Sequence, residues 1–155
     1  MPIPDSLVTA SAAETKRLAF QLARELARMS SDRARVIALS GNLGAGKTTF
    51  TQGFAKALGI AHPVQSPTFV LMKIYELEKK YLKHLVHIDA YRIETAGELE
   101  HLGFLKLLED GDAVILIEWA DRIKKILPKD TMWLMFEHGK NINERIIKIS
   151  NTISN

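Results

Sequence analysis

The sequence predicts an α/β fold, a mixed β-sheet flanked by helices and extended by antiparallel strands. Short apolar runs rich in β-branched residues alternate with segments of helical periodicity. A glycine-rich segment, residues 41–49, joins one such run directly to a helix. Two strand-like runs, residues 68–75 and 81–88, are separated only by a short connection, which favours an antiparallel hairpin over a purely parallel sheet.

The composition is that of an ordinary globular domain. The length of 155 residues predicts a single domain over residues 1–155, and 46% hydrophobic and 25% charged residues are typical values. The absence of cysteine excludes disulfides, thiolate catalysis and zinc–cysteine sites. The net charge is +3, and the Lys and Arg residues are scattered among acidic residues, so charge alone is weak evidence for nucleic-acid binding. With no signal-peptide pattern and no apolar run of spanning length, we expect a cytoplasmic protein with no membrane contact.

The first elements form a scaffold. Residues 6–9 are a candidate edge strand. A helix is expected from Ser11, because Ser11 and Glu14 have capping-box spacing and apolar residues follow at helical intervals as far as Met29. Its basic residues are interpreted as a solvated face. Residues 35–40 then form a short apolar run that predicts a buried strand.

Residues 41–49 fit the pattern G-x-x-x-x-G-K-[ST] and predict a nucleotide-binding P-loop. Glycines let backbone N–H groups turn toward a polyphosphate, and the helix that follows, expected over residues 48–58, presents its positive N-terminus. Lys47 is expected on the β/γ-phosphates and the Thr48 hydroxyl on Mg²⁺. The fold class is therefore a P-loop NTPase-like mixed sheet. The phosphate-binding candidates are Asn42, Leu43, Gly44, Ala45, Gly46, Lys47, Thr48 and Thr49.

The rest of the chain alternates strands and short helices. Two strands joined by a charged turn suggest a hairpin, and a helical region is interrupted by Gly103. The expected strands are residues 68–75, 81–88, 113–118, 132–136 and 145–149, and the expected helices are residues 94–108 and 119–127.

Two acids at strand ends are catalytic candidates. Glu118 ends an apolar strand, where a carboxylate can hold Mg²⁺ or polarise water; the alternative is a surface glutamate. Asp89 is a second candidate ligand or base, and an Asx turn is an equally good interpretation. Thr68 is a weaker candidate for the γ-phosphate or Mg²⁺, since threonine commonly opens strands. Trp119 is by base rate more often a core residue. The histidines show no metal-ligand spacing.

Five segments together resemble the TsaE (formerly YjeE) family. These segments follow one another along the chain, and the match runs from the first helix to Arg122. The sequence departs from the family at Asn42, Ala90 and Ala120, where the family usually has Asp, a larger apolar residue and Pro. None of these side chains is an expected metal ligand or an expected phosphate-binding side chain. The segments are residues 41–50 (GNLGAGKTTF), 66–69 (SPTF), 87–92 (HIDAYR), 98–103 (ELEHLG) and 117–122 (IEWADR).

The resemblance implies a P-loop fold that binds ATP or ADP with Mg²⁺ and hydrolyses ATP weakly alone. It implies action with the TsaD–TsaB pair in N6-threonylcarbamoyladenosine modification of adenosine 37, in tRNAs reading codons that begin with A, with tRNA reached through the complex. It supports Lys47 on phosphate, Thr48 and Glu118 at Mg²⁺, and Asp89 and Thr68 near the γ-phosphate. It also favours a role for Trp119.

Asp89 is the preferred base with Glu118 at the metal, and the reverse stays open. Two other functions are compatible with the P-loop. One is a kinase that transfers phosphate to a hydroxyl. The other is a nucleotide-binding regulatory module without turnover. No guanine-reading Asn-Lys-x-Asp motif and no arginine-rich lid is present, which disfavours a GTPase and a nucleoside-monophosphate kinase.

Overall fold

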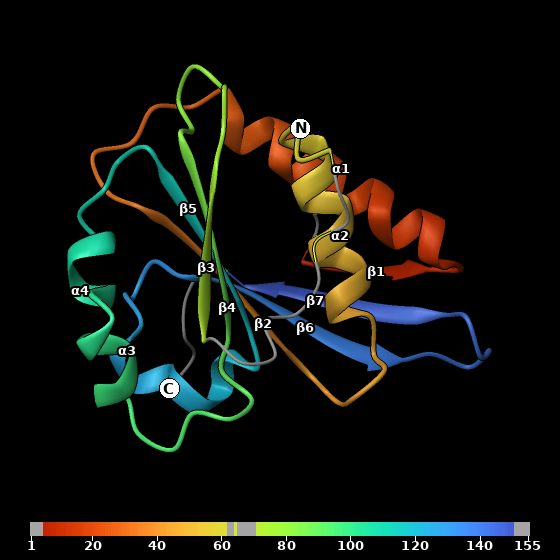
Figure 1. Cartoon of the computed structure of the whole chain (residues 1–155). Helices are drawn as coiled ribbons and strands as arrows, with labels where there is room; N and C mark the ends of the chain where they lie inside the picture. The colour runs from red at the N-terminus through yellow and green to blue at the C-terminus, as the bar shows by residue number, and fades with distance from the viewer. Residues whose placement is uncertain (1–4, 62–63, 65–70, 151–155) are drawn as a thin grey trace.

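The computed structural model describes residues 5–61, 64 and 71–150. These residues form a seven-stranded sheet in the order β1-β7-β6-β2-β5-β4-β3 (Figure 1). The strands are β1 (Ser6–Thr9), β2 (Arg35–Gly41), β3 (Met72–Glu76), β4 (His84–Asp89), β5 (Ala113–Glu118), β6 (Met132–His138) and β7 (Arg145–Ser150). The helices are α1 (Ala12–Ala27), α2 (Lys47–Ala57), α3 (Gly97–His101), α4 (Phe104–Leu107) and the 3₁₀ helix η1 (Ala120–Ile126).

The centre of the sheet is parallel and its margins are antiparallel. Strands β6, β2, β5 and β4 run parallel, while β3 pairs antiparallel with β4, β7 with β6, and β1 with β7. The predicted mixed sheet is confirmed, as are the hairpin of β3 and β4 and the edge strand β1. Strands β6 and β7 form a second hairpin. In the β4–β5 register Asp89 lies opposite Glu118, so the two candidate acids are neighbours.

Helices cover both faces of the sheet. Figure 1 shows α1 and α2 on one side and α3 and α4 on the other. The buried apolar residues divide accordingly: Leu116 belongs to the cluster under α1 and α2, and Ile115 and Ile117 to the cluster under α3, α4 and η1. Because neighbouring residues of β5 face opposite layers, all six of its residues are buried, which explains its continuous apolar sequence.

Helix α1 begins as predicted. The Ser11 hydroxyl accepts a hydrogen bond from the Glu14 N–H (3.2 Å). The Glu14 carboxylate accepts one from the Ala10 N–H (2.6 Å), one residue before the position it takes in a standard capping box. The helix ends at Ala27, so the expectation that it includes Met29 is wrong, and that side chain is 51% exposed.

Two strands begin later than predicted, and several others end one or two residues later. The strand expected over residues 81–88 begins at His84, because the first residue of its parallel neighbour is Ala113. Before that point the N–H groups of Lys83 and His84 both donate to the Asp112 carbonyl, which ends the ladder. The strand expected from residue 68 is β3, and its described part begins at Met72.

The short helix predicted for residues 119–127 is present after β5 and is of the 3₁₀ type. Residues 120–126 are a 3₁₀ helix, preceded by Trp119 in the left-handed region (φ 58°). This conformation is unfavourable for a residue with a side chain, and no other non-glycine residue in the described part of the chain adopts it. As predicted, Gly103 separates the helices α3 and α4; its φ value is 86°. In the described ranges no helix is long and apolar enough to cross a membrane.

Candidate nucleotide-binding site

The P-loop, residues 41–49, connects β2 to α2 (Figure 1). Gly41, Gly44 and Gly46 have φ values of 135°, 78° and 108°, which favour glycine. At Gly41 space is limiting as well, because a Cβ atom would lie 2.4 Å from the Phe136 carbonyl oxygen. Gly46 is the N-cap of α2, so the N-terminus of that helix opens at the end of the loop. The loop therefore has the backbone geometry that the motif predicts.

A cavity of about 370 Å³ lies beside the loop. Its lining comes from the P-loop, the ends of β4 and β5, the first turns of α1, and the start of β7. Of the predicted residues, Asn42 and Ala45 do not line it, and Thr68 lies outside the described residues. The lining residues are Ala12, Thr15, Leu43, Gly44, Gly46, Lys47, Thr48, Thr49, Asp89, Tyr91, Glu118, Trp119, Asn143 and Arg145.

Lys47 is buried in this site, with 5% of its surface exposed. Its ammonium donates to the carbonyls of Gly41 (2.5 Å) and Asn42 (3.0 Å) and lies 4.1 Å from the centre of the Trp119 ring. Burial lowers the pKa of Lys47, and the negative charge of Glu118 opposes that shift. Trp119, which lines the cavity, therefore covers a cation rather than packing only in the core.

Glu118 is buried, with 2% exposed, so the alternative of a surface glutamate is wrong. Its Oε1 accepts a hydrogen bond from the Thr48 hydroxyl (3.0 Å), and its Oε2 lies 2.6 Å from His87 Nε2. A hydroxyl and a carboxylate side by side are hard oxygen donors of the type Mg²⁺ binds. The described residues hold no cluster of three His, Cys, Asp or Glu suited to a metal. The pair thus fits Mg²⁺ held mainly by water and phosphate oxygens.

Asp89 combines both interpretations of its sequence position. Its Oδ1 accepts a hydrogen bond from the Tyr91 N–H (3.0 Å), which forms an Asx turn, and the residue also lines the cavity. Burial raises the pKa of Asp89, and the nearby Glu118 charge raises it further, while the hydrogen bond from Tyr91 lowers it. Two acids with different environments therefore face one cavity.

Arg145 and Asn143 are cavity residues that the sequence did not reveal. The Arg145 guanidinium donates to the Gly44 carbonyl of the P-loop (3.1 Å). It also donates to the carbonyls of Ile142 (2.7 Å) and Glu144 (2.9 Å) in the turn before β7. The β6–β7 turn is thereby tied to the P-loop. No local motif distinguishes Arg145 from the other basic residues, so only the sheet order brings it here.

The sequence profile described as "Threonylcarbamoyl adenosine biosynthesis protein TsaE" matches residues 9–147. The chain belongs to the TsaE family. Three relatives bear the name tRNA threonylcarbamoyladenosine biosynthesis protein TsaE. The Bacillus subtilis protein is 42% identical over 104 residues (67% of this chain, 62% of that protein). The Borreliella burgdorferi protein is 38% identical over 100 residues (64% and 69%), and the Aquifex aeolicus protein 38% over 113 residues (72% and 76%).

A solved structure agrees with this family assignment. The crystal structure of Bacillus subtilis YdiB has a TM-score of 0.74 and 32% identity, covering 96% of this chain and 85% of that one. The resemblance to TsaE proteins and the P-loop α/β fold class are thus confirmed. The match spans less than two thirds of the length of the Bacillus subtilis TsaE protein. Membership of the TsaE family is consistent with a nucleotide-binding protein of the P-loop type.

Proposed function

We propose that this chain is an ATP-binding and hydrolysing subunit for N6-threonylcarbamoyladenosine modification of adenosine 37 in tRNA. The observation that carries the proposal is the convergence of Lys47, Thr48, Asp89 and Glu118 on one cavity at the N-terminus of α2. The names of the TsaE relatives supply the biological process. In this proposal the chain acts with TsaD and TsaB and meets tRNA through that complex.

The protein's part in phosphate binding follows from charge and geometry. The backbone N–H groups of residues 44–48 and the α2 N-terminus surround the polyphosphate, and Lys47 leaves its carbonyl partners to contact it. Thr48 and Glu118 would hold Mg²⁺, which when bound neutralises charge between the β- and γ-phosphates. In this proposal Thr68 lies near the γ-phosphate, and Trp119 borders the nucleotide beside Lys47.

The two acids have separate roles in this proposal. Both oxygens of Glu118 are engaged, by Thr48 and His87, so its carboxylate is held in one orientation, as suits a metal ligand. Asp89 reaches the cavity beside it, and its raised pKa suits a group that accepts a proton from water. We therefore assign the base to Asp89. The reverse assignment predicts that Glu118→Gln, rather than Asp89→Asn, stops hydrolysis while Mg²⁺–ATP still binds.

The test is ATP hydrolysis by the protein alone and with TsaD, TsaB and tRNA. We expect a weak rate alone, a higher rate with the partners, and a loss of about 100-fold or more in Lys47→Met, which keeps an unbranched apolar side chain but removes the charge. Lys56→Met is the matched control, because Lys56 is an exposed residue of the same helix that does not line the cavity. Its rate should equal that of the wild type.

Two results would contradict this function. Tight nucleotide binding without turnover, even with the partners present, would favour the regulatory module. Transfer of labelled phosphate from ATP to a hydroxyl compound, rather than to water, would favour the kinase.

A further inference from the structure

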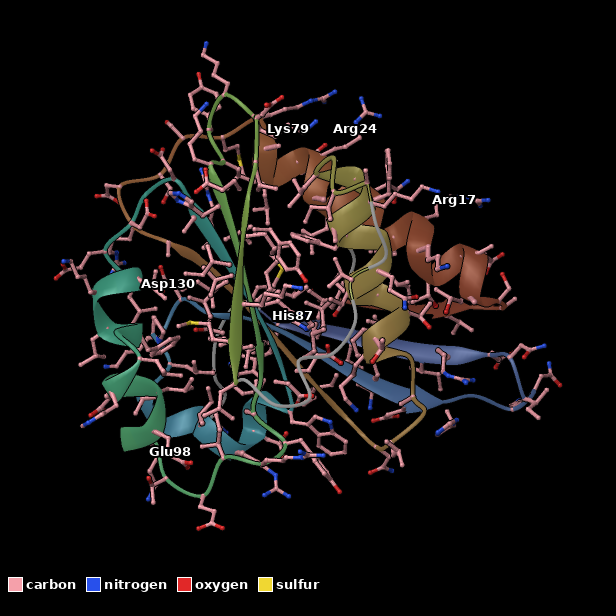
Figure 2. All side chains as sticks on the ribbon, in the orientation of Figure 1. Arg17, Arg24, Lys79, His87, Glu98 and Asp130 are labelled. Carbon is pink, nitrogen blue, oxygen red and sulfur yellow. The ribbon has the colours of Figure 1, made fainter. Side chains whose placement is uncertain are left out.

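A buried histidine is hydrogen-bonded to Glu118, the candidate metal ligand. His87, in β4, is 1% exposed and lies in the interior of the molecule (Figure 2). It stands two residues before Asp89 and two after Leu85, so the three side chains share one face of the strand. That is the face covered by α1 and α2, since Leu85 and Leu116, which lies opposite His87 in β5, belong to the cluster beneath those helices.

An imidazole at such a position has an energetic cost. Burying a polar group destabilises the fold unless it is hydrogen-bonded. His87 Nδ1 has no partner among the described residues, and the bond between its Nε2 and Glu118 Oε2 (2.6 Å) is the one contact that offsets the cost. An apolar side chain would suit the surroundings of Leu85 and Leu116 better. The histidine is therefore best explained by what it does to Glu118.

The hydrogen bond fixes the direction of the Glu118 carboxylate. A carboxylate only accepts, so the proton of this hydrogen bond is on His87 Nε2. With Oε2 held by His87, Oε1 points to the Thr48 hydroxyl (3.0 Å) and to the space in which Mg²⁺ would bind. Hydrogen bonds of this kind behind a ligand commonly determine metal affinity.

We propose that His87 is a positioning residue for Mg²⁺ binding, acting through Glu118; this inference rests on the proposed function. The His87 side chain does not line the cavity. Its effect is on the affinity for Mg²⁺ in the presence of nucleotide, and the affinity for the nucleotide itself is unchanged. A residue with a merely structural role would not separate these two quantities.

The experiment is calorimetric titration with a non-hydrolysable ATP analogue, in Mg²⁺ and in EDTA. In His87→Leu we expect unchanged binding in EDTA, but loss of most of the Mg²⁺ enhancement and a rise of about 10-fold or more in the Mg²⁺ concentration at half-saturation. His87→Gln, whose amide N–H can reach Oε2, should keep the wild-type enhancement. His84→Leu is the matched control, because His84 is in the same strand but pairs with Asp110.

Each outcome decides between the proposals. A wild-type Mg²⁺ response in His87→Leu overturns the role of His87 and leaves the proposed function intact. Failure of the wild type itself to bind the analogue overturns both. Should thermal unfolding show that His87→Leu is not folded, His87→Gln and the shorter His87→Asn decide: retention by Gln and loss by Asn support positioning, and equal Mg²⁺ responses in the two overturn it.

Discussion

Burial of ionisable side chains is concentrated at one place in this protein. Among the described residues the buried acidic and basic side chains are Lys47, His87 and Glu118. Each contacts the cavity or a residue that lines it. Acidic and basic groups are seldom buried without a partner or a function, so their position indicates the same candidate site independently of the P-loop motif.

At this scale we predict a pH-dependent difference between Asp89→Asn and the wild type in the absence of nucleotide. Folding raises the pKa of Asp89, mainly through burial, so the folded state binds the proton more tightly than the unfolded state. Ionised Asp89 therefore destabilises the fold. This destabilisation is absent below the pKa of Asp89 in the unfolded chain, which is about 4, and is complete above its raised pKa in the folded protein. Asparagine keeps an oxygen for the Tyr91 N–H and does not ionise.

The free energy of unfolding, measured in urea between pH 3 and pH 8, checks this prediction. The stability of Asp89→Asn relative to the wild type should increase as the pH rises through that window. If the free energy of unfolding changes with pH in the same way for the wild type and for Asp89→Asn, ionisation of Asp89 does not destabilise the fold and the prediction is wrong.

At the scale of elements, the P-loop is held from two sides. Strand β2 and helix α2 position its ends, and the Phe136 carbonyl in β6 allows only glycine at Gly41. From β7, Arg145 binds the Gly44 carbonyl in the middle of the loop. The motif predicts the loop, but its rigidity depends on strands that lie about a hundred residues further along the chain.

We predict that Arg145→Leu weakens nucleotide binding about 10-fold, because a hydrogen bond from a charged group is worth roughly 1.5–3 kcal/mol and its loss loosens the loop. The effect should appear in both Mg²⁺ and EDTA, unlike that of His87→Leu. Calorimetric titration with ADP measures it. Lys148→Leu, an exposed residue of the same strand that pairs with Glu137, is the control. Equal affinities for Arg145→Leu and wild type would refute the role of this contact.

At the scale of the whole molecule, the site exists only when the sheet is complete. Its lining joins residues near positions 12, 45, 90, 118 and 145, so the cavity is absent from the unfolded chain. A ligand that binds only the folded state stabilises it by mass action. Nucleotide binding should therefore report on the integrity of the entire fold.

We predict that Mg²⁺–ADP at about 100 times its Kd stabilises the protein by about 2.7 kcal/mol. For a domain of this size that corresponds to a rise of roughly 5–10 °C in Tm. Circular dichroism during heating measures it, and Lys47→Met, in the same buffer and ADP concentration, should show a smaller rise. An unchanged wild-type Tm at saturating ADP would mean that the cavity does not bind this nucleotide.

The local sequence was sufficient for those parts of the protein whose physics is local. The P-loop, the cap at Ser11, the break at Gly103 and the apolar run of β5 each depend on neighbouring residues, and all were predicted. Strand ends at Asp89 and Glu118 also follow from pattern, because a polar residue ends each apolar run. The start of β4 did not follow, since it depends on where its partner strand begins.

The contacts made across the sheet required the folded molecule. His87 and Glu118 are 31 residues apart in the chain, and Gly44 and Arg145 are 101 apart, so no spacing rule connects them. A histidine in an apolar strand and an arginine opening a strand have ordinary sequence contexts. Strand order and register bring His87 against Glu118, a candidate metal ligand, and Arg145 against the P-loop. Pairing between distant residues depends on the whole fold, so a local sequence pattern does not predict it.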